Sequence, residues 1–193
     1  MTRPAVFLDR DGTMIEEVGY LDREEDVRWF PWTIDAIRLL NRAGYVVCVV
    51  TNQGGIALGH FDEAFVTGLH ASLDATLRKS GAVVDGWFLC PHHPNAVVPE
   101  LQGPCECRKP GRGMIDAACA RWDIDLARSW VIGDRDVDVL MAAGAGARGI
   151  LVRTGYGERE WRTNADAFPE GTPVVMNLMA ATVLILTEGD TSA

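Results

Sequence analysis

The sequence predicts an α/β protein: a Rossmann-like three-layer sandwich, in which a central parallel sheet lies between two layers of helices. Short β-branched runs alternate along the chain with segments of helical periodicity, which is typical of parallel strands joined by crossover helices. The chain has 193 residues, enough to bury a substantial core in one domain. The apolar runs stop abruptly at polar residues, as happens where strands end at a functional edge.

Five strands are expected, at residues 5–8, 45–50, 83–89, 129–133 and 149–152. Five helices are expected, at residues 33–43, 62–79, 111–122, 136–144 and 177–187. The first helix has apolar residues at helical spacing and is followed by Gly44, a typical helix stop. The second carries Leu69, Leu73 and Leu77 at steps of four, which predicts one buried face.

Two segments interrupt the alternation, at residues 14–32 and 90–112. The first is too short to form a separate cap domain, so we expect it to form, together with the second, a minimal cap made of loops around an open site. The chain is expected to be a single domain over residues 1–188, with a frayed tail at 189–193.

Composition narrows the possible functions. The formal net charge of −9 argues against non-specific binding to nucleic acid or to an anionic membrane. The N-terminus lacks the pattern of a signal peptide, and the most apolar late stretch is too interrupted to span a bilayer comfortably. We therefore expect a cytoplasmic enzyme, and we further expect a monomer that acts on a small molecule. An anionic substrate would have to be held by local positive charge or by a metal.

Four polar motifs follow the expected strands and should meet at one edge of the sheet. They are Asp9-Arg10-Asp11-Gly12-Thr13, Thr51-Asn52-Gln53-Gly54-Gly55, Arg108-Lys109-Pro110 and Gly133-Asp134-Arg135-Asp136-Val137-Asp138. Any one of them alone is more often a turn or a helix cap. Together they supply carboxylates, a hydroxyl and a lysine, which suit phosphoryl transfer with a divalent cation.

Each motif has a chemical role in this interpretation. The Asp9 carboxylate can attack phosphorus, which divides one difficult displacement into two easier ones. A Mg²⁺ ion shared by Asp9 and Asp134 would remove the repulsion between carboxylate and phosphate. Lys109 and the hydroxyl of Thr51 would stabilise the transferring oxygens. Asp11, on the same side as Asp9, would protonate the leaving alkoxide and later activate water.

The second interrupting segment contains Cys90-x-His92, twelve further residues, and then Cys105-x-Cys107. Three thiolates and one imidazole make a closed tetrahedral set, which predicts a structural zinc site. The spacings are tighter than usual, and the alternative is a group of unrelated surface residues. Because Cys107 directly precedes the cations of the third motif, zinc would fix the loop that delivers them.

The stretches "LDRDGT", "VVTNQGG", "CRKPGRGM" and "VIGDRDVD" resemble, in order, the four motifs of the haloacid dehalogenase superfamily of phosphotransferases. The resemblance covers about residues 5–155. It implies that Asp9 is the nucleophile and Asp11 the general acid and base. It further implies that Mg²⁺ binds Asp9, the backbone carbonyl of Asp11, and Asp134.

More narrowly, the chain resembles the branch of heptose-bisphosphate phosphatases, whose members carry the same cysteine loop. That resemblance implies a role for Arg108 in substrate recognition, and sugar contacts from Glu17, Val18, Gly19 and Tyr20. The residues themselves suggest further substrate contacts from Arg135 and from the backbone amides of Asn52, Gln53 and Gly54. Asp138 is expected to support Lys109 or the metal shell, while the roles of His93 and Arg112 stay open.

Three functions follow from this interpretation. The resemblance implies removal of the 7-phosphate from a heptose 1,7-bisphosphate, with the 1-phosphate retained. The alternative is a histidinol-phosphate phosphatase, since the chain is also similar to that branch and an acidic rim residue such as Glu17 would suit a cationic substrate. A non-catalytic zinc-stabilised module is the third, and the intact set of Asp9, Asp11, Lys109 and Asp134 argues against it.

Overall fold

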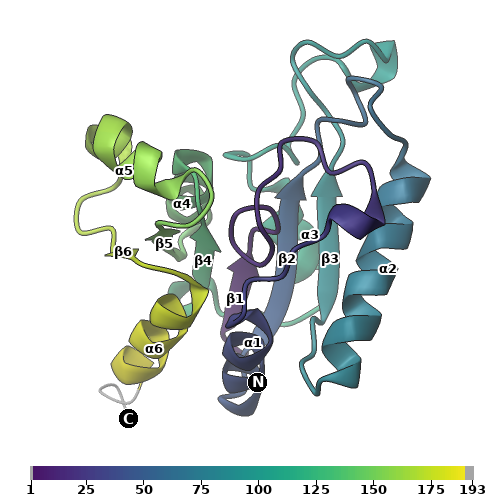
Figure 1. Ribbon diagram of the computed structural model, residues 1–193. Helices are drawn as coiled ribbons and strands as arrows, with labels where there is room; N and C mark the ends of the chain where they lie inside the picture. Colours follow the sequence, from purple (N-terminus) through teal and green to yellow (C-terminus); the bar gives the residue numbers. More distant parts are fainter. Residues whose placement is uncertain (1, 190–193) are drawn as a thin grey trace.

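Six parallel strands form one sheet, in the order β3-β2-β1-β4-β5-β6 (Figure 1). They are β1 (Ala5–Leu8), β2 (Val46–Asn52), β3 (Gly86–Cys90), β4 (Trp130–Gly133), β5 (Arg148–Val152) and β6 (Val174–Val175). The computed structural model describes residues 2–189. Because β1 pairs with both β2 and β4, the strand order reverses beside it. Such a reversal leaves a crevice beyond the carboxyl ends of the strands.

Helices cover both faces of this sheet, so the predicted three-layer sandwich is confirmed (Figure 1). They are α1 (Thr33–Arg42), α2 (Glu63–Lys79), α3 (Gly113–Cys119), α4 (Asp136–Ala145), α5 (Gly157–Asn164) and α6 (Leu178–Gly189). Helices α1, α2 and α6 pack on one face, and α3 and α4 pack on the other.

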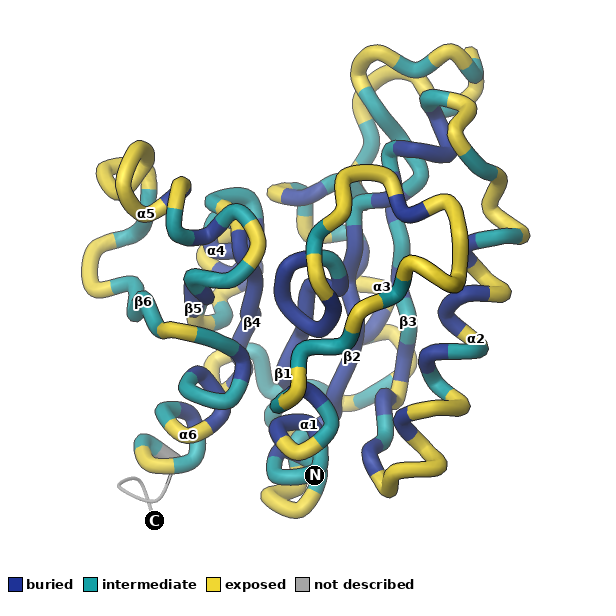
Figure 2. The backbone as a smooth tube through the Cα atoms, in the orientation of Figure 1, coloured by how far each residue is buried: buried dark blue, intermediate teal, exposed yellow. Residues whose placement is uncertain are grey.

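The central strands are buried on both faces, as the alternation of their side chains shows. Leu8 and Ile132 face α1, α2 and α6, whereas Phe7 and Val131 face α3 and α4. The strands lie inside the molecule, while exposed residues follow the outer faces of the helices and the loops (Figure 2). A parallel sheet covered on both faces explains why the strand sequences are almost continuously apolar.

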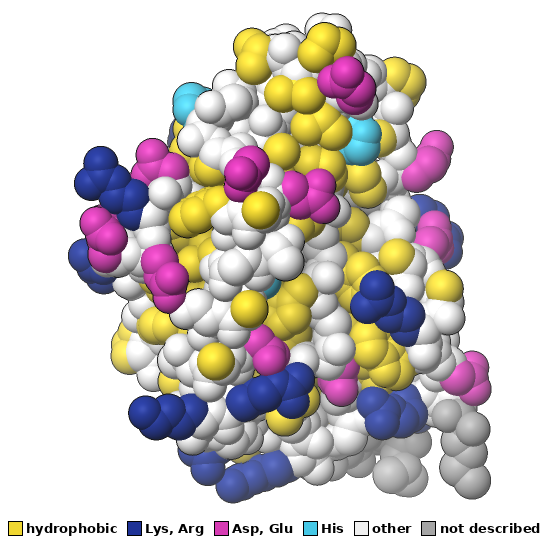
Figure 3. Space-filling model, turned by 90° about the vertical axis from the view of Figure 1, so that its right-hand side faces the viewer, with side chains coloured by type: hydrophobic (Ala, Val, Ile, Leu, Met, Phe, Trp, Pro, Cys, Tyr) yellow, Lys and Arg dark blue, Asp and Glu magenta, His cyan; other side chains and the backbone are white. Residues whose placement is uncertain are grey.

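Local signals set the ends of the helices. The side chain of Asp62 accepts a hydrogen bond of 2.7 Å from the backbone N–H of Phe65 and so caps α2. Gly146, at φ 77°, takes the left-handed conformation that ends α4. The last turn of α2 carries Arg78 and Lys79, which favour the negative end of the helix. Figure 3 shows the side of the molecule on which α2 lies: Lys and Arg gather at its lower end, and hydrophobic side chains gather towards its upper end.

Several elements differ from the prediction. The strand expected at 83–89 begins at Gly86, because side chains hold the residues before it. Val83 donates to the Asn41 side chain at 2.8 Å, and the Asp85 carboxylate accepts from the Val47 amide at 2.8 Å. The helix expected at 111–122 is shorter, and β2 runs further than expected.

Two elements were not predicted. Strand β6 has two residues, too few to produce a pattern of alternation. Helix α5 reads GEREWRTN, with Trp161 as its one large apolar side chain, so no apolar periodicity marks it. It packs near β5, at the end of the sheet where the strands point (Figure 1).

The two interrupting segments carry short 3-10 turns, η1 (Glu24–Asp26) and η2 (Pro99–Leu101). Residues 90–112 rise above the sheet (Figure 1). Of the expected tail, Gly189 is the last residue of α6, and residues 190–193 lie outside the described residues. No helix within residues 2–189 combines the length and the apolar character that a membrane crossing requires.

Two neighbouring leucines of α1 provide a test of the packing. Leu40 is fully buried in the core under α1, α2 and α6, whereas Leu39 is half-buried and outside that cluster. We expect Leu40→Ala to lower the free energy of unfolding in urea by about 2–5 kcal/mol, because it leaves a cavity. The matched variant Leu39→Ala should lower it by less than about 1 kcal/mol. Equal losses would contradict this packing.

Candidate active site

A cavity of about 420 Å³ opens at the carboxyl ends of the strands. All four predicted motifs contribute to its wall, as the crevice beside β1 requires. Its lining comprises Asp9, Arg10, Asp11, Glu17, Gly19, Tyr20, Leu21, Thr51, Asn52, Gln53, Gly54, Gly55, Phe61, His93, Arg108, Lys109, Asp134, Arg135, Val137, Asp138 and Tyr156. The structure therefore brings together motifs that lie more than a hundred residues apart.

A buried lysine connects three of the motifs. The Nζ atom of Lys109 lies 2.5 Å from Oδ1 of Asp9 and 2.6 Å from Oδ1 of Asp138. It also donates to the carbonyl of Val50 at 3.1 Å. The second carboxylate oxygen of Asp138 accepts from the backbone N–H of Arg135 at 3.1 Å. Asp138 thus supports Lys109 and at the same time holds the first turn of α4.

Burial dominates the electrostatics of this group. It raises the pKa of Asp9 to about 7, although the charge of Lys109 opposes the shift. Burial and then the charge of Asp9 raise the pKa of Asp134 well above its usual range. For Lys109, burial alone would lower the pKa, but the attraction of Asp138 and Asp9 outweighs it and the pKa rises. Lys109 is therefore held as a cation.

Three buried carboxylates lie close to one another here, and two of them contact the single ammonium group. One oxygen each of Asp9, Asp134 and Asp138 lies within 4.8 Å of the others, and all three residues are buried. One lysine balances only part of this negative charge, so the donor set fits a divalent cation with oxygen ligands. Since Asp138 is already engaged by Lys109 and by an amide, Asp9 and Asp134 are the carboxylates available to such a cation.

Backbone contacts fix the carboxylate of Asp134. Its Oδ2 accepts from the amide of Tyr156 at 2.7 Å. Gly12 (φ 80°) and Gly155 (φ 56°) pack against it so closely that a Cβ at either position would lie 2.1 Å from Oδ2. Thr154 donates to the carbonyl of Gly12 at 2.5 Å and joins the end of β5 to the loop after β1. Only glycine, which has no Cβ, permits the close approach of residues 12 and 155 to the Asp134 carboxylate.

The second motif contributes side chains more than backbone amides. The Nε2 group of Gln53 lies 2.8 Å from the Thr51 hydroxyl and 2.9 Å from Oδ2 of Asp11. The backbone N–H of Gln53, one of the amides expected to contact the substrate, donates to the carbonyl of Cys90 at 2.8 Å, whereas its side chain lines the cavity. The side chain of Asn52 accepts from the amide of Lys109 at 3.0 Å and so orients the lysine backbone.

The cysteine loop brings its expected ligands together. Separations of 3.7 Å join Cys90 to His92 and to Cys105, and the Sγ atoms of Cys105 and Cys107 are also 3.7 Å apart. The distance from Cys107 to His92 is 3.4 Å, and the two sulfurs of Cys90 and Cys107 are 2.8 Å apart. A tetrahedron with bonds of about 2.3 Å has edges of about 3.8 Å, so four of these five separations fit a zinc site, while the sulfurs of Cys90 and Cys107 lie closer together than such a site requires.

This cluster is coupled to the cavity. Arg108 follows Cys107 directly and donates to the carbonyl of His92 at 2.8 Å. His93 lines the cavity and lies against Gly54, where a Cβ would be 2.9 Å from the imidazole. Arg112 instead forms an exposed ion pair with Asp116 at 2.7 Å. Of the two positions left open by the sequence, only His93 belongs to the cavity lining found in the described residues.

The rim contains three of the four residues implied by the resemblance. Glu17, Gly19 and Tyr20 line the cavity, whereas Val18 is absent from the described lining and is 48% exposed. Burial and then the charge of Asp11 raise the pKa of Glu17. The ring of Tyr20 stacks on that of His60, with centroids 4.2 Å apart.

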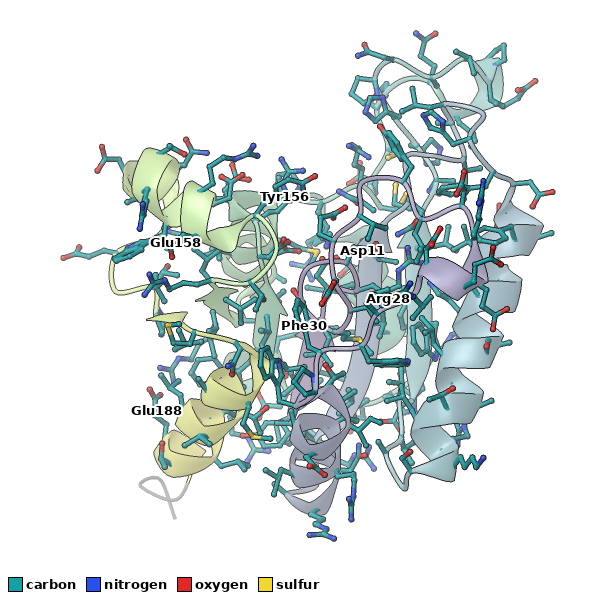
Figure 4. All side chains as sticks on the ribbon, in the orientation of Figure 1. Asp11, Arg28, Phe30, Tyr156, Glu158 and Glu188 are labelled. Carbon is teal, nitrogen blue, oxygen red and sulfur yellow. The ribbon has the colours of Figure 1, made fainter. Side chains whose placement is uncertain are left out.

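Another part of the wall comes from Tyr156, which directly precedes α5, a helix that was not predicted. Asp11 and Tyr156 lie at the same edge of the sheet (Figure 4). The guanidinium of Arg135 lies 5.2 Å from the centre of the Tyr156 ring, and its Nε is 3.8 Å from the buried Glu160. Tyr156 follows the fifth strand in the same way that the four motifs follow theirs, and that position is the signal by which it could have been found.

Comparison with known proteins places the chain among characterised families. A family model described as HAD-hydrolase-like matches residues 106–181. The D-glycero-D-manno-heptose-1,7-bisphosphate 7-phosphatase of Thermosynechococcus vestitus is 44% identical over 163 residues, covering 82% of this chain and 83% of the relative. The D-glycero-beta-D-manno-heptose-1,7-bisphosphate 7-phosphatase of Escherichia coli K12 is 42% identical over 154 residues, covering 79% and 80%.

Solved structures of heptose-bisphosphate phosphatases also match this chain. The D,D-heptose 1,7-bisphosphate phosphatase of B. bronchiseptica, complexed with magnesium and phosphate, matches with a TM-score of 0.85 at 34% identity, covering 96% of this chain and 99% of the other. The corresponding enzyme of Burkholderia thailandensis matches with a TM-score of 0.72 at 30% identity, covering 96% and 99%. The chain therefore belongs to the haloacid dehalogenase superfamily of hydrolases, in the family of the heptose-1,7-bisphosphate 7-phosphatases.

Proposed function

We propose that this protein is a Mg²⁺-dependent phosphatase that removes the 7-phosphate of D-glycero-D-manno-heptose 1,7-bisphosphate through an aspartyl-phosphate intermediate. The observation that carries the proposal is the buried contact of Asp9 with Lys109 beside Asp134, inside one cavity. The names of the relatives, which cover about four fifths of the chain, support the choice of substrate.

Asp9, Asp134 and the backbone carbonyl of Asp11 would hold the magnesium ion. When bound, Mg²⁺ supplies positive charge that offsets the carboxylates and the phosphate dianion. The magnesium and phosphate bound in the B. bronchiseptica structure support this assignment.

The residues of the chain then divide the reaction. A carboxylate oxygen of Asp9 forms a bond to phosphorus while the bond from phosphorus to the sugar oxygen breaks. Asp11 gives a proton to that oxygen, and later takes one from the water that hydrolyses the acyl phosphate. Lys109 and the Thr51 hydroxyl stabilise the phosphoryl oxygens as charge develops on them.

Cations on the rim suit a second phosphate. Arg108 and Arg135 line the cavity and would bind the retained 1-phosphate as guanidinium forks. Glu17, Gly19 and Tyr20, with the amide of Gly54, would face the sugar hydroxyls. Two guanidinium groups would repel the cationic amine of histidinol phosphate, and the relatives compared carry heptose-bisphosphate names, so the alternative substrate is not favoured.

The cluster of Cys90, His92, Cys105 and Cys107 would hold a structural zinc ion. Its role is to fix the loop that carries Arg108 and Lys109 to the cavity. The cysteines of the described chain form no disulfide, which suits a reducing cytoplasm. Because residues of one chain line the cavity, we infer that a monomer can carry out the reaction.

Removal of the nucleophile tests the mechanism. We expect Asp9→Asn to lower the rate of phosphate release by on the order of 10³-fold or more, because an amide does not form the acyl phosphate. The exposed carboxylate of Asp26 provides the control, since Asp26→Asn should leave the rate unchanged. Turnover in Asp9→Asn equal to that of the unaltered protein would contradict the enzyme assignment.

Substrate choice is tested by phosphate release from both anomers of heptose 1,7-bisphosphate, from fructose 1,6-bisphosphate and from histidinol phosphate. We expect the heptose bisphosphates to give the highest kcat/KM. Arg135→Gln should lower that value about 10- to 100-fold, the cost of a hydrogen bond to a charged group, while the exposed Arg128→Gln should not. A preference of at least about 100-fold for histidinol phosphate would overturn the substrate assignment.

The zinc site is tested by Cys107→Ser. We expect loss of bound zinc, a Tm lower by at least about 5 °C and slower turnover, because the loop that delivers Lys109 is no longer fixed. Cys119→Ser, outside the cluster, should keep the zinc. Metal content, thermal unfolding and phosphate release measure the three effects. Loss of zinc with full stability and full turnover would contradict a structural role.

A further inference from the structure

The residue between the two catalytic aspartates is itself buried. Arg10 is 1% exposed and is the largest by volume of the fully buried residues described. A guanidinium group keeps its charge at any physiological pH and offers only N–H donors, so each of its nitrogens requires an acceptor when it is buried. The mechanism proposed above gives Arg10 no role.

Part of the guanidinium is paired with Asp11. Its Nε lies 3.1 Å from both carboxylate oxygens, and its Nη2 lies 2.9 Å from Oδ2. The side chain of Gln53 donates to the same Oδ2 at 2.9 Å. Asp11 is therefore held from two sides, although 18% of its side chain remains exposed to the cavity.

The far side of the guanidinium is paired with a histidine of α2. Nη1 of Arg10 lies 3.2 Å from Nε2 of His70. Since the guanidinium can only donate, Nε2 of His70 is the acceptor and the imidazole is neutral, with its proton on Nδ1. Burial and then the charge of Arg10 lower the pKa of His70 to about 3, in agreement with this assignment.

His70 is itself held in place. It is 6% exposed, and its ring stacks on that of Trp87 from β3, with centroids 4.8 Å apart. The indole N–H of Trp87 points to the Asp74 carboxylate at 3.4 Å. Helix α2 and strand β3 thus fix the imidazole, the imidazole fixes the guanidinium, and the guanidinium fixes the carboxylate.

We propose that His70 and Arg10 are positioning residues that hold the carboxylate of Asp11 in the orientation for proton transfer to the leaving oxygen. The proposal rests on the proposed phosphatase function. His70 acts at a distance, because it is absent from the described lining of the cavity.

The role predicts a dependence on the leaving group. When a sugar phosphate reacts, the bond to the sugar oxygen breaks and Asp11 supplies the proton for that oxygen. When p-nitrophenyl phosphate reacts, p-nitrophenolate leaves without a proton. The ratio kcat/KM reports only the steps up to the first irreversible one, the transfer of the phosphoryl group to Asp9. A misplaced Asp11 therefore lowers kcat/KM for the sugar phosphate alone.

The experiment compares His70→Leu with His70→Gln. The leucine leaves Nη1 of Arg10 without an acceptor, so we expect kcat/KM for the heptose bisphosphate to fall at least about tenfold, and that for p-nitrophenyl phosphate less than about twofold. The glutamine side chain offers an oxygen acceptor and should restore most of the loss. Leu69→Ala, on the same helix and 2% exposed, is the control for destabilisation alone and should not separate the two substrates.

Equal losses for both substrates in His70→Leu, or no loss in the folded variant, would overturn the positioning role. If His70→Leu does not fold, His70→Gln and the shorter His70→Asn decide, because only the glutamine is long enough to reach Arg10. Equal activity of these two variants on the sugar phosphate would then overturn the proposal. Failure of the phosphatase function would appear in the unaltered protein, which would release phosphate from neither substrate.

Discussion

The structure depends on one buried ammonium group and its two carboxylate partners. A lysine deprived of water must be paired, and loss of either partner leaves an uncompensated charge in the interior. Asp9 comes from the end of β1, Asp138 from the first turn of α4, and Lys109 from the loop that carries the cysteine cluster. The pairing therefore fixes three separate parts of the chain against one another, and it fixes the proposed nucleophile with them.

The same pairing leaves a negative excess that defines the rest of the site. Within residues 2–189 no lysine pairs with Asp134, and its carboxylate is enclosed by Gly12, Gly155 and the amide of Tyr156. Burial raises the pKa of Asp9 and of Asp134, so each carboxylate is more stable with a bound proton or a nearby cation than as an unpaired anion. A magnesium ion would meet this need and would at the same time attract a phosphate dianion, so a chain of net charge −9 could act on an anionic substrate.

The sequence predicted structure correctly where a local pattern of residues determines it. Apolar runs followed by polar residues predicted the sheet, its functional edge and the convergence of Asp9 with Lys109. The sequence did not predict those features that depend on contacts between distant parts of the chain. Helix α5 buries too little apolar surface to show a period, and the amide of Gln53 is taken by a carbonyl that β3 brings to it. Arg10 had no visible partner, because its histidine lies sixty residues away on α2.

We propose that Asp9, held by Lys109, accepts the phosphoryl group. This role is tested by mixing the protein with Mg²⁺ and ³²P-labelled heptose bisphosphate, quenching the reaction in acid during turnover, and mapping the labelled peptide. We expect a covalent phosphate on Asp9 that is lost on treatment with mild base, as is typical of an acyl phosphate. Turnover without a covalent phosphate, or a label on another residue, would contradict it.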